Sequence, residues 1–184
     1  APSAVGFRRP SNRWRPRWAS PSPTISLRQP PDRFVAAGCL CQSRGVDLQY
    51  LADRLAISDF LTTYAHAVDT KDWELYRSCF TDDADIDYTS AGGIRGTLDE
   101  IVTWMGSTMV MFDATQHLVS NEMVEIDGDT ATVRAMFYNP MHFAGDNAGY
   151  FDCGGWYNHE LIRTDDGWKS RKLWEDFSWT TMGK

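Results

Sequence analysis

The pattern of apolar and polar residues changes near residue 48. Before it there is almost no hydrophobic periodicity, whereas from Gln49 to Asp69 apolar residues recur every three or four positions. This spacing predicts a long amphipathic helix. The residues expected to form its buried stripe are Leu51, Leu55, Ile57, Leu61, Tyr64 and Val68.

Shorter elements are expected between residues 70 and 114. Thr70 is a suitable N-cap for a short helix that runs through Trp73, Tyr76 and Phe80. Ala84–Tyr88 is predicted to be a strand. Thr97-Leu98-Asp99-Glu100 has the sequence of a capping box, which predicts a helix through Ile101, Trp104, Met105 and Met109.

The chain after Ala114 has the pattern of long strands joined by tight turns. Asp127-Gly128-Asp129 separates Leu118–Ile126 from Thr130–Tyr138. Asp165-Asp166-Gly167 separates in the same way Trp156–Arg163 from Trp168–Trp179. Such turns are typical of hairpins. Helices followed by an antiparallel meander, with one earlier strand, predict an α+β fold whose sheet curls around the helices.

Composition separates the same two regions. Residues 1–48 hold seven of the eight prolines and carry a net charge of +6, whereas residues 49–184 carry −13. We therefore expect residues 1–48 to be a disordered basic extension and residues 49–184 to form a single domain. The extension is also compatible with a transit peptide, an export signal or nucleic-acid binding. We favour a solvated segment without a role, and no nucleic-acid partner.

Several classes of function are excluded or disfavoured. No run of 18 apolar residues is present, so no membrane-spanning segment is predicted. The phosphate-binding, dinucleotide-binding, serine-hydrolase and zinc-protease motifs are missing. The four cysteines form no metal-binding or disulfide pattern, which suggests a reducing, cytoplasmic location. We expect neither a metal nor a cofactor.

The class of function that remains is acid–base catalysis by His, Asp and Tyr side chains. Of the four histidines, His66 falls on the polar side of the predicted helix, and His159 lies among charged strand residues. Both are expected at the surface. His117 and His142 are the remaining candidates.

Four motifs in register resemble scytalone dehydratase over about residues 50–180. They are Asp69-Thr70-Lys71-Asp72-Trp73, Ile86-Asp87-Tyr88, Thr115-Gln116-His117 and a proline-containing strand with His142. That family belongs to the superfamily of nuclear transport factor two, ketosteroid isomerase and SnoaL-like proteins, which have a cone-shaped α+β barrel. Tyr64, together with Asp69 and His117, is also similar to the Tyr–Asp–His set of bacterial bile-acid dehydratases.

The resemblance implies the roles of the site residues. Asp69 and His117 match the catalytic dyad, His142 the second histidine, and Tyr88 a tyrosine that polarises the substrate carbonyl. Val68 stands where the fungal enzyme has a second tyrosine, and Gly155 and Tyr157 stand where it has serine and asparagine.

The expected function is dehydration of a β-hydroxy carbonyl on a small, hydrophobic, cyclic substrate of steroid-like or polyketide-like type. Histidine titrates near neutral pH, and an ionised aspartate fixes its tautomer. An isomerase or cyclase using the same dyad, or a non-catalytic binding module of the same fold, remains an alternative. The Trp- and Tyr-rich late strands suggest a homo-oligomer, a dimer or trimer.

Overall fold

The structure is a computed structural model that describes residues 47–145 and 149–183. The predicted disordered extension, residues 1–48, therefore lies outside the described residues except for its last two. Leu48 is already the first residue of a helix.

Helices and strands alternate in the first half of the described chain, and long strands fill the second half. The elements are α1 (Leu48–Thr70), α2 (Trp73–Ser78), β1 (Phe80–Asp87), η2 (Thr89–Ala91), β2 (Arg95–Thr97), α3 (Leu98–Thr108), η3 (Met109–Met111), β3 (Phe112–Thr115), β4 (Leu118–Asp127), β5 (Thr130–Phe143), β6 (Tyr150–Thr164) and β7 (Gly167–Gly183). Both predicted hairpins, β4–β5 and β6–β7, are present. The capping box of Thr97 and Glu100 is also present, at the start of α3.

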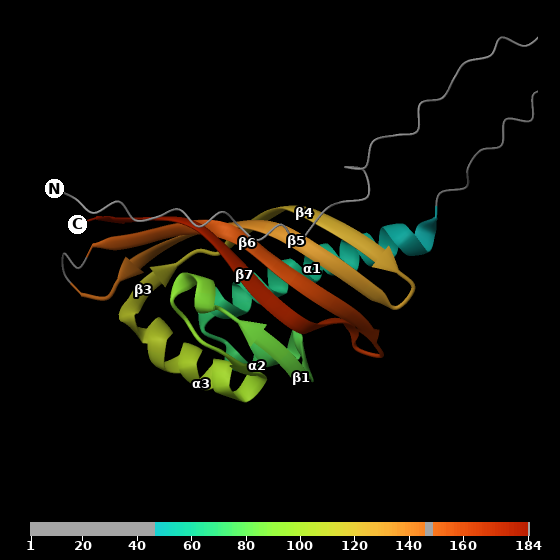
Figure 1. The fold of residues 1–184 in the computed structure, drawn as a ribbon, viewed down its shortest axis with the longest axis horizontal. Helices are drawn as coiled ribbons and strands as arrows, with labels where there is room; N and C mark the ends of the chain where they lie inside the picture. The colour runs from blue at the N-terminus through green and yellow to red at the C-terminus, as the bar shows by residue number, and fades with distance from the viewer. Residues whose placement is uncertain (1–46, 146–148, 184) are drawn as a thin grey trace, which may run out of the picture. The chain divides into compact units, whose positions relative to one another are not determined.

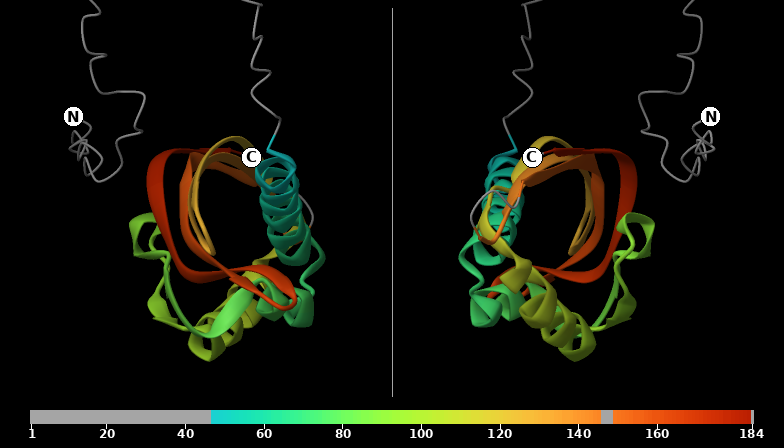
Figure 2. Two further views of the ribbon diagram at one scale, coloured as in Figure 1. Left: turned by 90° about the vertical axis from the view of Figure 1, so that its right-hand side faces the viewer. Right: turned by 90° about the vertical axis from the view of Figure 1, so that its left-hand side faces the viewer.

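The strands form one mixed sheet. Its order is β2-β1-β7-β6-β5-β3, with β4 also paired to β5. β1 and β7 are parallel, and all other pairs are antiparallel. The sheet is strongly curved, and α1 lies along its open side (Figures 1 and 2). The predicted α+β fold, with a curved sheet around helices, is confirmed.

The core lies between α1 and the concave face of the sheet. Alternate residues of β5 are buried, as the period of two in its sequence predicts. The C-terminal half of α1 packs its apolar side against them; its buried residues there are Ile57, Phe60, Leu61, Tyr64, Ala65, Ala67 and Val68. Within the described ranges, no helix has the length and apolar character needed to cross a membrane.

The first half of α1 differs from the prediction. Leu51 is 46% exposed and Leu55 is 68% exposed, whereas Asp53 is only 4% exposed. The predicted stripe is therefore wrong before Ile57. The reason is the phase of the helix: Asp53 is on the same face as Ile57, whereas Leu51 and Leu55 are on the opposite face. Arg163 of β6 donates two hydrogen bonds to the Asp53 carboxylate, at 2.6 and 2.8 Å. This pair allows an acidic residue to occupy the buried face of the helix.

Two further donors complete this cluster. Trp168 Nε1 donates to Asp53 Oδ1 at 3.3 Å, and Gln49 Nε2 donates to the same oxygen at 3.2 Å. The Arg163 guanidinium also lies 4.5 Å from the centre of the Trp168 ring. Bidentate charge-assisted hydrogen bonds are among the strongest in proteins. The cluster therefore attaches the beginning of α1 to β6 and β7.

The end of α1 is fixed by a Schellman motif. Lys71 has φ of 57°, its N–H donates to Val68 O at 3.1 Å, and the Asp72 N–H donates to Ala67 O at 2.9 Å. Asp72, and not Thr70 as predicted, is the N-cap of α2 and accepts from Leu75 N at 2.9 Å. Thr70 is instead the last residue of α1.

Candidate active site

Asp69 lies in the last turn of α1. A carboxylate at this position is close to the negative end of the helix dipole, which is unfavourable by about 0.3–1 kcal/mol. The side chain must therefore be stabilised from elsewhere. The Schellman motif ends the helix directly after it, so that its carboxylate meets the segment that joins β3 to β4.

The Asp69 carboxylate receives three contacts, one from Thr115 at the end of β3 and two from His117. Its Oδ1 lies 2.6 Å from His117 Nδ1 and accepts from Thr115 Oγ1 at 2.8 Å. Its Oδ2 accepts from the His117 backbone N–H at 2.9 Å. The carboxylate and the imidazole are thus held by the backbone as well as by their own contact.

These contacts determine the charge state of the pair. Burial alone would raise the pKa of Asp69, but the hydrogen bonds from His117 and Thr115 outweigh it and lower that pKa. The carboxylate is therefore ionised at neutral pH. A carboxylate at Nδ1 favours a proton on that nitrogen and leaves Nε2 as the basic nitrogen of the neutral ring.

Three tyrosine hydroxyls form a second group. The hydroxyl of Tyr88 lies 2.8 Å from that of Tyr64 and 2.9 Å from that of Tyr76. Tyr64 is on α1, Tyr76 on α2, and Tyr88 directly follows β1. All three are at least nine-tenths buried. The structure thus brings Tyr64 and Tyr88 together, as their expected common site requires.

Burial keeps these phenols protonated. It raises the pKa of Tyr64, Tyr76 and Tyr88 above the ordinary value. Each phenol has one proton to donate. The two contacts among the three hydroxyls use two of these protons.

A cavity of about 230 Å³ lies beside both groups. His117, Tyr64 and Tyr88 line it, but Asp69 is set behind His117. The remaining lining is largely apolar and includes Trp104, Met105, Met109, Phe112, Met141 and Phe151. Apolar cavities with a few convergent polar groups are typical small-molecule sites. Flexible methionine side chains allow such a wall to adapt to its ligand.

His142 is not part of this arrangement. Met141 lines the cavity, and because side chains alternate along a strand, His142 lies on the outer face of β5. Its side chain is exposed there, with its ring 6.4 Å from that of Tyr150. The structure therefore does not bring the second histidine of the resemblance to the dyad.

The two histidines expected at the surface differ from each other. His66 is exposed, as predicted. His159, by contrast, is fully buried, and its Nδ1 lies 3.0 Å from Ser170 Oγ. Phe60 and Tyr64 pack against its ring, and burial lowers its pKa to about 3. The surface prediction for His159 is wrong, because its strand turns this residue toward α1.

Sequence reasoning missed three polar residues of the site, namely Tyr76, Asn139 and Glu175. Asn139 and Glu175 line the cavity, and Asn139 Nδ2 donates to the Tyr157 hydroxyl at 2.8 Å. Asn139 occupies an inward position of β5, which its alternation with apolar residues would have indicated. Gly155 is also informative, because a Cβ there would lie 2.2 Å from Asp176 O. Serine therefore does not fit at this position.

Other chemistries have less support in this cavity. Cys153 lines it, but burial raises the pKa of its thiol to about 12 and keeps it protonated. In the described ranges, no group of three or more His, Cys, Asp or Glu side chains is arranged to hold a metal ion.

A curved α+β sheet closed by a long helix, with an acid–base pair beside an apolar cavity, defines a protein of the nuclear transport factor two-like superfamily. Within it, the chain belongs to the SnoaL-like domain family, whose model matches residues 49–173. It is also 40% identical to the uncharacterized protein Rv2910c of Mycobacterium tuberculosis over 119 residues. That alignment spans 65% of this chain and 81% of the relative.

Solved structures with the same fold are named for different activities. A candidate aromatic ring hydroxylase from Novosphingobium aromaticivorans is 30% identical, with a TM-score of 0.66 and coverage of 72% of this chain and 94% of that one. A candidate scytalone dehydratase from the same species is 20% identical (TM-score 0.65; 72% and 88%). The hexachlorocyclohexane dehydrochlorinase LinA-type3 of Novosphingobium barchaimii is 20% identical (TM-score 0.66; 74% and 94%). The fold is thus shared, and the reaction must be argued from the site.

Proposed function

We propose that the protein is a cofactor-independent dehydratase that removes water from a β-hydroxy carbonyl compound. The observation that carries this proposal is the 2.6 Å contact between Asp69 Oδ1 and Nδ1 of His117, a histidine that also lines the apolar cavity. A base of this kind, with phenol donors in the same cavity, is suited to chemistry through an enolate.

The reaction follows from the roles of these groups. His117 Nε2 removes the proton on the carbon next to the carbonyl, and a Tyr64 or Tyr88 hydroxyl donates to the enolate oxygen that forms. Asp69 stabilises the resulting imidazolium. The enolate then re-forms the carbonyl, the bond to the β-hydroxyl breaks, and the imidazolium proton leaves with that oxygen as water. The dyad is thereby restored.

The cavity limits the substrate. Its volume of about 230 Å³ is below the common range of about 300–1,000 Å³ for small-molecule sites. A compound of one or two rings therefore suits it better than a four-ring steroid. The aromatic and methionine lining favours a flat, hydrophobic ring system.

The test is a mass-spectrometric assay of the full chain with cyclic β-hydroxy ketones, such as 3-hydroxycyclohexanone and 3-hydroxy-1-tetralone. We expect a product that is lighter by one water. A product of unchanged mass would indicate the isomerase or cyclase alternative. Binding without any product across the panel would indicate a binding module and contradict the dehydratase proposal.

Replacing Tyr88 with phenylalanine tests the phenol donors. We expect kcat to fall by about 10- to 1,000-fold, because one donor to the enolate oxygen is lost. Tyr76→Phe is the matched control. Tyr76 contacts Tyr88 but does not line the cavity, so a smaller loss is expected. An unchanged kcat in Tyr88→Phe would show that this hydroxyl takes no part in the reaction.

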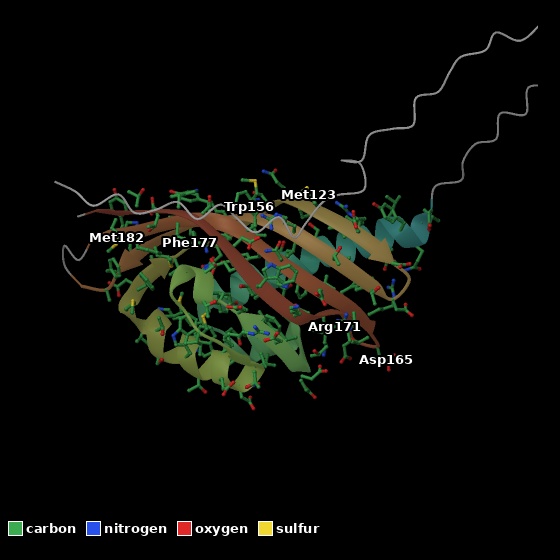
Figure 3. The ribbon with its side chains drawn as sticks, viewed as in Figure 1. Met123, Trp156, Asp165, Arg171, Phe177 and Met182 are labelled. Atoms are coloured by element: carbon green, nitrogen blue, oxygen red, sulfur yellow. The ribbon has the colours of Figure 1, made fainter. Side chains whose placement is uncertain are left out.

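We also propose that the protein is a homodimer. Leu118, Met136, Tyr138, Trp179 and Met182 are all at least 40% exposed on β4, β5 and β7. Tyr138 and Trp179 flank Gly154 of β6, so this apolar patch continues across three strands. Figure 3 shows Met182 at the end of the β6–β7 hairpin remote from Asp165 and Arg171. Exposed aromatic and methionine side chains in one patch are typical of interfaces.

Light scattering at tens of micromolar tests the dimer. We expect a mass of about twice 20.9 kDa for the wild type and a shift toward monomer for Met136→Glu. Leu55→Glu, at an exposed position of α1, should not change the mass. A monomeric wild type would contradict the proposal.

A further inference from the structure

Glu175 is a buried acid in the cavity wall that the proposed reaction does not use. It lies on β7 opposite Tyr157 of β6, and it is only 8% exposed. Its described hydrogen bond involves the backbone carbonyl, which accepts from Ser90 Oγ at 2.7 Å. None of the described hydrogen bonds or ion pairs involves its carboxyl group. Because Glu175 lines the cavity, its carboxyl group is open to a partner from a bound ligand.

The surroundings of Glu175 keep its carboxyl group uncharged. Burial, with a smaller contribution from the neighbouring Asp176 carboxylate, raises its pKa to about 8. The titratable groups that face it from other elements are Tyr64 of α1 and Cys153 and Tyr157 of β6. Burial raises the pKa of each of these groups, so all are neutral near pH 7. The protonated carboxyl offers one donor and one acceptor.

Asn139 provides a buried polar atom without a partner in the same cavity. It is 3% exposed, and its Nδ2 donates to the Tyr157 hydroxyl, whereas its Oδ1 has no partner. Turning the amide around would leave the nitrogen unsatisfied instead. In either orientation, one polar atom of Asn139 awaits a ligand.

These groups lie along a diagonal across the sheet. His117 immediately precedes β4, whose first residue pairs with Tyr138, so His117 is next to Asn139 of β5. Asn139 pairs with Cys153 of β6, and Tyr157, four residues further along β6, pairs with Glu175 of β7. Three strand spacings of about 4.8 Å and an offset of four residues at about 3.3 Å each place the backbones of His117 and Glu175 about 19 Å apart along the curved sheet. The cavity thus has polar groups at two ends.

We propose that Glu175 is a specificity-determining residue, which binds an uncharged hydroxyl group at the end of the substrate remote from His117. A hydroxyl can accept from the carboxyl proton and donate to the carboxyl oxygen or the Asn139 amide. A carboxylate or phosphate is disfavoured, because no cation accompanies Glu175 in its described contacts to offset a buried negative charge. This inference rests on the proposed function only in assuming that the substrate occupies this cavity with its carbonyl near His117.

The test measures binding, so that it is independent of turnover. Dissociation constants at pH 6.5 are compared for 1-naphthol and for 1,5-, 1,6- and 1,7-dihydroxynaphthalene, using isothermal calorimetry on the full chain. We expect at least one dihydroxy compound to bind the wild type at least about tenfold more tightly than 1-naphthol. Glu175→Leu should remove this preference while keeping the affinity for 1-naphthol.

Three variants make the result specific. Glu175→Gln keeps a donor and an acceptor and should retain the preference, which separates recognition from any folding defect of Glu175→Leu. Glu160→Gln changes an acid outside the cavity lining and should have no effect. Asp69→Asn should also retain the preference, even if dehydration is lost or was never observed. A wild type without the preference, or a preference that survives in Glu175→Leu, would overturn the inference and leave the dehydratase proposal untouched.

Discussion

Asp69→Asn is expected to lower kcat on a β-hydroxy ketone by at least about 100-fold. The change keeps the size of the side chain but removes the charge that stabilises the His117 imidazolium and fixes its tautomer. In Ser-His-Asp enzymes the corresponding change costs about 10⁴-fold. His117→Ala should be similarly severe. Because residues that act as one unit are not additive, the double variant should be little worse than either single variant.

The controls separate catalysis from folding. Asp72→Asn changes a nearby aspartate that caps α2 and does not line the cavity, so its kcat should stay close to that of the wild type. Each variant is compared at equal folded concentration, and its affinity for 1-naphthol is measured. Turnover within threefold of the wild type in Asp69→Asn would remove the dehydratase proposal. A fall in melting temperature without loss of turnover per folded molecule would assign Asp69 a structural role.

The largest effect on stability is expected from Asp53→Ala. The change leaves the Arg163 guanidinium and Trp168 Nε1 without their acceptor in a largely buried cluster. Removing one partner of a buried ion pair costs about 3–5 kcal/mol. The Arg163 side chain is 31% exposed, so a value of about 3 kcal/mol is expected. Thermal and urea unfolding measure it.

Asp129→Ala is the matched control, because Asp129 also pairs with Arg163, at 3.0 Å, but is 84% exposed. Its loss should cost less than about 1 kcal/mol. An equal loss of stability in both variants would show that the burial of Asp53 contributes nothing.

The same cluster predicts a response to acid. The hydrogen bonds from Arg163 lower the pKa of Asp53 from 3.8 to about 2. The folded state therefore holds the carboxylate ionised where the unfolded state is already protonated. The resulting stabilisation is fully present above pH 3.8 and is lost as the pH falls toward 2. Asp53→Ala should thus lose less stability than the wild type over this range.

The sequence predicted those features that depend on neighbouring residues. The Asp-Gly turns and the Thr97–Glu100 capping box are local signals, and both were found where expected. Asp69 and His117 are 48 residues apart in the sequence. Their contact was predicted only through the resemblance of several motifs to a known family. Periodicity alone does not identify such a pair.

The wrong predictions concern the face of a strand or helix on which a side chain lies. His142 and Met141 are adjacent on β5, and the period of two in this strand turns Met141 inward and His142 outward. His142 was placed in the site by the resemblance and not by this pattern. In α1, apolar residues predicted a buried stripe that includes Leu51 and Leu55. These two residues lie on the face opposite Ile57, and the buried face continues instead through Asp53, which pairs with Arg163 far away in the sequence. Only the partner of Asp53 is not visible in a single segment.

The two attachments of α1 also limit how this chain can change in length. Asp53 is joined to β6 and Asp69 to the segment before β4, so the helix between them spans a fixed gap of about 24 Å. One residue inserted between them would advance Asp69 by about 1.5 Å and rotate it by about 100°. Either the ion pair or the contact with His117 would then be lost. Insertions are therefore tolerable in the hairpin turns of the domain, whereas this part of α1 must retain its number of residues.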